Sequence, residues 1–149
     1  MSEFRPVDIL YVEDSATDAE VTLRALRKVN LGNNLIWVKD GQDALDLLRG
    51  SGAYASQPRA VPRLVLLDLK MPKVDGLEVL KAIRATEALR ALPVVMLTSS
   101  AEEADLVRSY ELGVNSYIVK PVDFTRLSDE VARLGYYWVL MNRLPESGG

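Results

Sequence analysis

The sequence predicts an α/β fold in which five parallel strands form one doubly wound sheet with helices on both faces. Two observations lead to this prediction. Five short apolar runs, rich in β-branched or aliphatic residues, recur along the chain, and helical patterns with start and stop signals lie between them. Strict alternation of nearly continuous apolar strands with helices is typical of a parallel sheet that is buried on both faces.

The apolar runs are too short for helices and are predicted to be strands. They are Val7–Val12, Leu35–Val38, Leu64–Leu67, Val94–Leu97 and Tyr117–Val119. The connection before the third run is unusual because it is long and contains Gly, Ser and Pro residues. This segment, from Ser51 to Pro62, is predicted to be a surface loop.

Two of the predicted helices begin at a capping box, in which a hydroxyl residue precedes a Glu by three positions. Thr17 to Glu20 fits this pattern at the start of the first helix, and Ser100 to Glu103 fits it at the start of the fourth. Gly113 is placed to serve as the C-cap of that fourth helix, which is expected from about Ala101 to Leu112.

The other helices follow short turn signals. One begins after Asp40-Gly41 and one after Asp75-Gly76, and the last is expected from about Asp123 to Met141. Neither a repeat nor a shift in composition suggests a second domain, so residues 1–149 are expected to form one domain.

Several function classes are disfavoured by composition. The chain of 149 residues has no Cys and no His, so thiolate chemistry, imidazole bases and the common zinc sites are excluded. A net charge of -3 argues against nucleic acid as a partner. No apolar run approaches the roughly 18 residues of a membrane span, and the N-terminus lacks a signal-peptide pattern, so we expect a cytoplasmic protein without a membrane partner.

Polar residues follow four of the five predicted strands. Glu13 and Asp14 come after the first, Asp68 after the third, Thr98 after the fourth and Lys120 after the fifth. Ligands of open α/β sheets bind outside the carboxyl ends of the strands, which lie at one edge. Each of these residues alone is readily explained as a cap, a turn or a solvated charge. Three carboxylates in one crevice, however, are costly unless a cation lies among them.

This set of side chains fits phosphoryl transfer. Ligands that are all oxygen atoms suit Mg²⁺, which keeps several waters and is completed by a phosphate group. An Asp can form an aspartyl phosphate, and a metal with a lysine neutralises charge on the transferring oxygens. Because the chain has no His, its phosphoryl donor must be another molecule.

Four segments, LYVEDS, LVLLDLKMPKVDG, VVMLTSS and SYIVKP, resemble in order the signature blocks of bacterial response-regulator receiver domains. The resemblance covers about residues 7–135. It implies the flavodoxin-like (βα)5 receiver fold with strand order 2-1-3-4-5. It also implies a phosphoacceptor of a two-component phosphorelay, which takes its phosphoryl group from a histidine kinase and is no enzyme beyond its own phosphorylation and autodephosphorylation.

Carried over by position, the resemblance makes Asp68 the phosphoacceptor and Mg²⁺ the cofactor. Asp14 would bind the metal directly, together with Asp68, and Glu13 would bind it through water. Lys70 would give the metal its backbone carbonyl and not its ammonium group.

The resemblance also implies which residues bind the phosphoryl group and which form the conformational switch. Thr98 would hydrogen-bond one phosphoryl oxygen and Lys120 would pair with another. Tyr117 stands at the switch aromatic, which turns inward as Thr98 moves; an amphipathic residue at a strand edge is the alternative. Lys120-Pro121 is the bond that the family holds in cis.

The end of the chain suggests an interface. After Lys120-Pro121 only about one helix remains, so no output domain is expected and the signal must pass by protein contact. Residues 136–141 are apolar around the whole helix, which extends to about residue 144, and one sheet cannot cover every side. We expect a homodimer, with capping within the chain as the alternative; the interface residues would be Tyr136, Tyr137, Trp138 and Met141.

The GYYW segment and the long loop before the third strand are similar to single-domain response regulators that partner phytochrome-type histidine kinases. Three other classes fit less well. A phosphatase of the haloacid dehalogenase type expects an acid where Lys70 stands. A flavodoxin-like nucleotide binder needs a phosphate loop where Glu13-Asp14-Ser15 would repel phosphate, and a pure scaffold needs no such set of residues.

Overall fold

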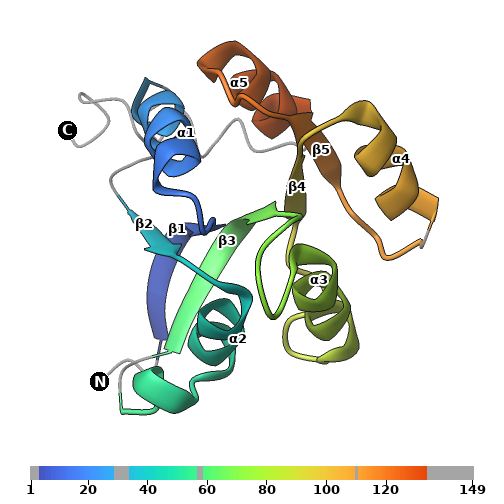
Figure 1. Ribbon diagram of the computed structural model, residues 1–149. Helices are drawn as coiled ribbons and strands as arrows, with labels where there is room; N and C mark the ends of the chain where they lie inside the picture. The colour runs from blue at the N-terminus through green and yellow to red at the C-terminus, as the bar shows by residue number, and fades with distance from the viewer. Residues whose placement is uncertain (1–3, 29–33, 57–58, 110, 134–149) are drawn as a thin grey trace.

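One parallel sheet of five strands, in the order β2-β1-β3-β4-β5, forms the centre of the computed structural model (Figure 1). The structure describes residues 4–28, 34–56, 59–109 and 111–133. Strands and helices alternate along the chain as predicted. The elements are β1 Phe4–Val12, α1 Ala16–Lys28, β2 Leu35–Val38, α2 Gly41–Arg49, a 3₁₀ helix Gly52–Tyr54, β3 Arg59–Asp68, α3 Gly76–Ala85, β4 Val94–Thr98, α4 Ala101–Ser109, β5 Ser116–Val119 and α5 Phe124–Arg133.

Helices cover both faces of the sheet (Figure 1). Helices α2, α3 and α4 pack on one face, and α1 and α5 pack on the other. Because side chains alternate along a strand, each central strand contributes to both clusters. On β3, for example, Val65 and Leu67 face the first group of helices, while Leu64 and Leu66 face α1 and α5. The doubly wound fold and its strand order are confirmed.

The parallel register brings the carboxyl ends of the strands to one edge. Val12 on β1 lies beside Val38 on β2 and Leu67 on β3, and Asp68 lies beside Leu97 on β4. The chain after each strand therefore leaves the sheet at the same edge. This edge carries the residues that the sequence singled out.

Strand β3 is longer than predicted, and the predicted loop from Ser51 to Pro62 is wrong at both ends. Residues 59–62 pair with residues 4–7 of β1, and Gly52–Tyr54 forms a 3₁₀ helix. The prediction relied on uninterrupted apolar runs, whereas Arg59, Pro62 and Arg63 interrupt the pattern without preventing the extended pairing. Residues 57–58 lie outside the described part.

The predicted capping box of the first helix is wrong. Helix α1 begins at Ala16, and the Ser15 side chain accepts a hydrogen bond from the backbone N–H of Asp18 at 3.2 Å. Thr17 therefore lies inside the first turn. Ser15 and Asp18 have the same three-residue spacing as Thr17 and Glu20, so spacing alone could not distinguish the two caps.

The start of α4 agrees with the prediction, but its end does not. Ser100 Oγ accepts from the backbone N–H of Glu103 at 3.2 Å, while the Glu103 carboxylate accepts from Ser99 N, one residue earlier than in a strict capping box. The helix ends at Ser109, so Gly113 is not its C-cap, although Gly113 does have a positive φ of 71°. The Arg84 side chain binds the carbonyl of Gly113 and holds it in the following loop.

Helix α5 is described from Phe124 to Arg133 and begins next to Asp123, whose side chain caps the backbone N–H of Arg126 at 2.8 Å. The predicted continuation to Met141 or to residue 144 lies outside the described residues. None of the described helices is both long enough and apolar enough to cross a membrane.

Candidate functional site

Three carboxylates meet at the carboxyl ends of β1 and β3. Glu13, Asp14 and Asp68 each place one oxygen within 4.8 Å of the others. Glu13 is fully buried, Asp68 is 5% exposed, and Asp14 is open to solvent. The sequence predicted this convergence from the order of the strand ends. Two buried acids therefore lie beside an exposed one at this edge of the sheet.

The backbone and side chain of Glu13 are both held in place. Its N–H donates to the Val38 carbonyl at 3.1 Å, and its carbonyl accepts from the Trp37 indole Nε1 at 2.9 Å. Its carboxylate accepts from Ser15 N at 3.2 Å and, at a longer 3.4 Å, from the Tyr11 hydroxyl. Burial raises the pKa of Tyr11 above its ordinary value, so this hydroxyl keeps its proton to donate.

The Lys120 ammonium group lies among the carboxylates. Its Nζ is 2.8 Å from Glu13 Oε1, 2.9 Å from Asp68 Oδ1 and 2.9 Å from Asp18 Oδ2. An ammonium group has three N–H donors, so these contacts can engage all three. Burial alone would lower the pKa of Lys120, but its hydrogen bonds to the carboxylates raise that pKa above its ordinary value. The Lys120-Pro121 bond is cis, as expected.

The Asp68 carboxyl group has an unusual protonation equilibrium. Burial, followed by the nearby charge of Glu13, raises the pKa of Asp68 to about 7, although the hydrogen bond from Lys120 acts in the opposite direction. A raised pKa means that the site destabilises an isolated negative charge on Asp68. A cation bound among the three carboxylates would relieve that cost.

Close backbone packing supports the turn after Asp68. A Cβ atom on Gly76 would lie 2.2 Å from the Asp68 carbonyl oxygen and 2.8 Å from Leu69 Cα. The absence of a side chain therefore lets α3 begin directly against the strand end. Gly76 N also donates to the Leu69 carbonyl at 2.8 Å, and Asp75 with Glu78 forms a complete capping box at the start of α3.

Thr98 is the last residue of β4, and Tyr117 lies on β5. Thr98 is buried, and its hydroxyl donates to the Ser100 carbonyl at 3.1 Å. Its own carbonyl accepts from Lys120 N at 2.8 Å, which connects the two strand ends. Tyr117 is half-buried, and the Arg108 guanidinium lies over its ring, 4.6 Å from the centroid. The structure thus places Tyr117 against α4.

The Lys70 ammonium group pairs with Glu103 and not with the three clustered carboxylates. Its Nζ lies 2.6 Å from Glu103 Oε2 on α4, and the side chain is 75% exposed. The hydrogen bond from Lys70 lowers the pKa of Glu103. This arrangement agrees with the prediction that Lys70 would offer the metal its backbone carbonyl and not its ammonium group.

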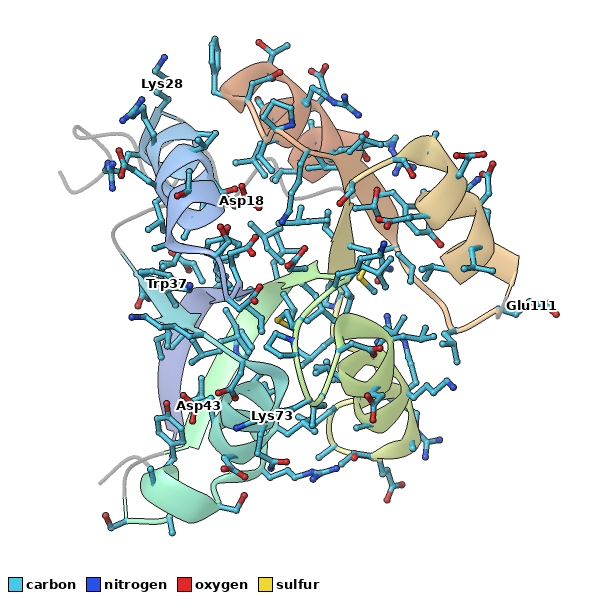
Figure 2. All side chains as sticks on the ribbon, in the orientation of Figure 1. Asp18, Lys28, Trp37, Asp43, Lys73 and Glu111 are labelled. Atoms are coloured by element: carbon cyan, nitrogen blue, oxygen red, sulfur yellow. The ribbon has the colours of Figure 1, made fainter. Side chains whose placement is uncertain are left out.

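Two residues of the site were not predicted from the sequence. Asp18 contacts Lys120 from the first turn of α1, and Trp37 contacts Glu13 from β2 (Figure 2). The contact of Asp18 with Lys120 depends on where α1 begins, and no local spacing indicated it. No sequence pattern indicated the second. The predicted interface residues Tyr136, Tyr137, Trp138 and Met141 lie outside the described part of the chain.

The donor set fits a hard divalent cation. All three clustered groups are carboxylates, which suit Mg²⁺ or Mn²⁺, and the cluster carries more negative charge than Lys120 alone balances. The buried position of Asp68, with its raised pKa, supports the same reading because an added cation would stabilise the ionised form.

Comparison with known proteins places the chain among signalling proteins. Residues 9–132 match the model of the response regulator receiver domain. The response regulator Rcp1 of Synechocystis sp. is 39% identical over 140 residues, which are 94% of this chain and 94% of Rcp1. A structure of its Mn²⁺-bound form matches with a TM-score of 0.69 and 40% identity, covering 89% of this chain and 94% of that one.

Two solved bacteriophytochrome response regulators are also similar. RtBRR matches with a TM-score of 0.84 and 51% identity, covering 91% of this chain and 80% of its own. AtBRR matches with a TM-score of 0.82 and 53% identity, covering 91% of this chain and 95% of its own. The fold is therefore shared with these proteins, over 91% of this chain in each match.

Proposed function

Because the chain belongs to the response regulator receiver domain family, we propose that it is a phosphoacceptor of a two-component phosphorelay. It accepts a phosphoryl group on Asp68 in the presence of Mg²⁺ and signals by protein contact. It catalyses only its own phosphorylation and autodephosphorylation.

The contact between Lys120 and Asp68 is the observation that carries this proposal. In the transfer, an Asp68 carboxylate oxygen bonds to phosphorus while the bond from phosphorus to the donor nitrogen or oxygen breaks. The leaving group takes the electron pair of that bond, and water later cleaves the acyl phosphate. The Lys120 ammonium, 2.9 Å from Asp68 Oδ1, is placed to neutralise a phosphoryl oxygen. The Thr98 hydroxyl would exchange its bond to Ser100 for another phosphoryl oxygen.

The carboxylates supply the metal site in this proposal. Asp14 and Asp68 would bind Mg²⁺ directly, Glu13 would bind it through water, and Lys70 would contribute its backbone carbonyl. When bound, Mg²⁺ supplies positive charge to the phosphoryl oxygens. The Mn²⁺-bound structure of the relative Rcp1 supports this assignment.

The signal passes from Thr98 to Tyr117 and α4. Phosphorylation adds negative charge at a buried edge, which draws the Thr98 hydroxyl toward Asp68. Tyr117 then turns inward and leaves its contact with Arg108 on α4. The Lys70–Glu103 ion pair joins the same helix to the loop after Asp68, so α4 is coupled to the site from both sides.

The partners follow from the chemistry and the relatives. A chain without His receives its phosphoryl group from a separate histidine kinase, and the two bacteriophytochrome response regulators support a kinase of the phytochrome type. We further propose a cytoplasmic homodimer that is joined through Tyr136, Tyr137, Trp138 and Met141. The receiver core is proposed to comprise about residues 7–135 of a single domain, with a helical extension to about residue 144.

A beryllium fluoride mimic tests the proposed chemistry. With Mg²⁺ and beryllium fluoride, fluorine NMR of the wild-type protein is expected to show a bound resonance at one equivalent. The Asp68→Asn variant and a wild-type sample in EDTA are expected to show only free fluoride species. A bound resonance of equal intensity in the Asp68→Asn variant would overturn the assignment.

A further inference from the structure

The loop that carries Glu13 and Asp14 depends on a contact from the neighbouring strand. Trp37 lies on β2, directly beside Tyr11 of β1 in the parallel register, and its indole packs partly buried on the α1 side of the sheet (Figure 2). From there its Nε1 reaches past the end of β1 to the Glu13 carbonyl, at 2.9 Å. This length is that of a well-formed hydrogen bond.

The Trp37 contact fixes the peptide bond between the two acidic residues. The carbonyl of Glu13 belongs to the same planar peptide unit as the backbone nitrogen of Asp14. The N–H on the other side of Glu13 is bound to the Val38 carbonyl. Strand β2 therefore holds Glu13 at both of its backbone groups, and the orientation of the second peptide determines where the Asp14 carboxylate begins.

This role requires the indole N–H as a hydrogen-bond donor, and not only the volume of the ring. The Glu13 carbonyl lies one residue beyond the last paired position of β1 and β2, and the Val38 group that binds the Glu13 N–H is a carbonyl, which cannot donate to it. A Phe at position 37 would fill much of the same space but would have no N–H. The carbonyl would then lose its donor beside a fully buried carboxylate.

We propose that Trp37 is a positioning residue for the divalent cation, which acts by orienting the Glu13–Asp14 peptide. This inference rests on the proposed function, because it presupposes that the carboxylates bind Mg²⁺. Outer contacts that orient metal ligands commonly contribute 10- to 100-fold to affinity. Since Trp37 holds a backbone group and not the ligand side chain, the lower end of that range applies.

Calorimetric Mg²⁺ titrations of three proteins test the proposal. For Trp37→Phe, the Mg²⁺ dissociation constant is expected to rise about tenfold. Leu35→Ala is the matched control, because Leu35 also packs partly buried from β2 on the same side but pairs with Ile9, four residues before Glu13. It should lose stability and keep the wild-type Mg²⁺ dissociation constant.

Phosphorylation kinetics separate positioning from a general structural defect. The Mg²⁺ concentration for half-maximal labelling of Trp37→Phe by a small phosphodonor should rise by the same factor, while the rate at saturating Mg²⁺ matches the wild type. Equal Mg²⁺ affinity in Trp37→Phe and wild type would overturn the proposal. Equal weakening in Trp37→Phe and Leu35→Ala would also overturn it, because packing would then explain the effect.

A measurement on the native indole makes the test independent of the variant's folding. In the wild-type protein, which has two tryptophans, Trp37 gives the indole resonance that is absent from the spectrum of Trp37→Phe. Its indole N–H resonance should shift on addition of Mg²⁺, with the calorimetric dissociation constant. A resonance that stays unmoved while Mg²⁺ binds would overturn the role of Trp37 alone. A wild-type protein that binds no Mg²⁺ would instead overturn the metal assignment, and this inference with it.

Discussion

The Lys120 ammonium lies 2.9 Å from Asp68 Oδ1 and 2.8 Å from Glu13 Oε1, and so provides the positive charge between two buried acids. Lys120 is itself 17% exposed. One side chain therefore has two roles in this account. It compensates the buried carboxylates before phosphorylation, and it is available to the phosphoryl group afterwards.

Replacing Lys120 by Met should destabilise the protein strongly without Mg²⁺ and less strongly with it. Breaking a buried ion pair by removing one partner leaves an uncompensated charge, which costs about 3 kcal/mol. Urea denaturation in EDTA should show this loss, and saturating Mg²⁺ should restore part of it. Lys70→Met, which removes an exposed ammonium, is the control. A Lys120→Met variant as stable in EDTA as Lys70→Met would contradict the account.

Gly76→Ala should displace the backbone at the phosphoacceptor. The new Cβ would lie 2.2 Å from the Asp68 carbonyl oxygen, a distance that forces movement of α3 or of the strand end. Overpacking of this kind costs about 2 kcal/mol, measurable by urea denaturation. At Gly113 a Cβ would meet only the Arg84 side chain, at 3.2 Å, so Gly113→Ala should cost less despite its positive φ. A larger loss of stability in Gly113→Ala than in Gly76→Ala would be inconsistent with the close packing of Gly76 against the Asp68 carbonyl.

Arg84→Met should loosen the loop that follows α4. The Arg84 guanidinium donates to the carbonyls of Leu92 at 2.7 Å and Gly113 at 2.6 Å, and to the Asn115 side chain at 3.2 Å. Removing these bonds leaves the partly buried Leu92 carbonyl and the exposed Gly113 carbonyl without their donor, at a cost of about 2 kcal/mol. Hydrogen exchange should accelerate in residues 111–115. Arg90→Met, at an exposed position, serves as the control, and equal exchange in the two variants would refute this role.

The stability contributed by Glu130 should depend on pH. Burial alone would raise the pKa of Glu130, but hydrogen bonds from Ser116 and Arg133 lower it below its ordinary value. A lowered folded-state pKa gives stability that is fully present above the unfolded-state value of about 4.3 and is lost as pH falls through the folded-state pKa.

Thermal denaturation of Glu130→Gln against wild type checks this dependence. The variant should be less stable at pH 7, and the difference should disappear as the pH falls well below 4. Asp129→Asn, at a neighbouring exposed position, should show little difference at any pH. If the difference in thermal stability between Glu130→Gln and wild type persisted unchanged in acid, the charge of Glu130 would not be its cause.

The strand ends were predictable because parallel topology fixes them. Once β1, β3 and β5 are read as strands of one parallel sheet, Glu13, Asp68 and Lys120 must leave it at the same edge. The structure accordingly places the Lys120 ammonium in contact with both acids. Their chemical roles are still predictions.

Contacts that depend on rotation and register could not be predicted. Asp18 reaches Lys120 only because α1 begins at Ala16. The spacing of Thr17 and Glu20 had predicted a different first residue for this helix. Trp37 reaches Glu13 because β2 pairs with β1 in one particular register, which no local pattern specifies. The Arg84 side chain, 28 residues away in sequence, binds the Leu112 carbonyl in the loop after α4, and no local pattern indicated this contact either.

Intact-mass spectrometry after treatment with a small phosphodonor tests the central claim most directly. With Mg²⁺, the wild-type chain should gain the mass of one phosphoryl group, and peptide mapping should place it on Asp68. Asp68→Asn with Mg²⁺, and wild type in EDTA, should gain none. Equal labelling of wild type and Asp68→Asn would contradict the account, as would a phosphoryl group mapped to any other residue.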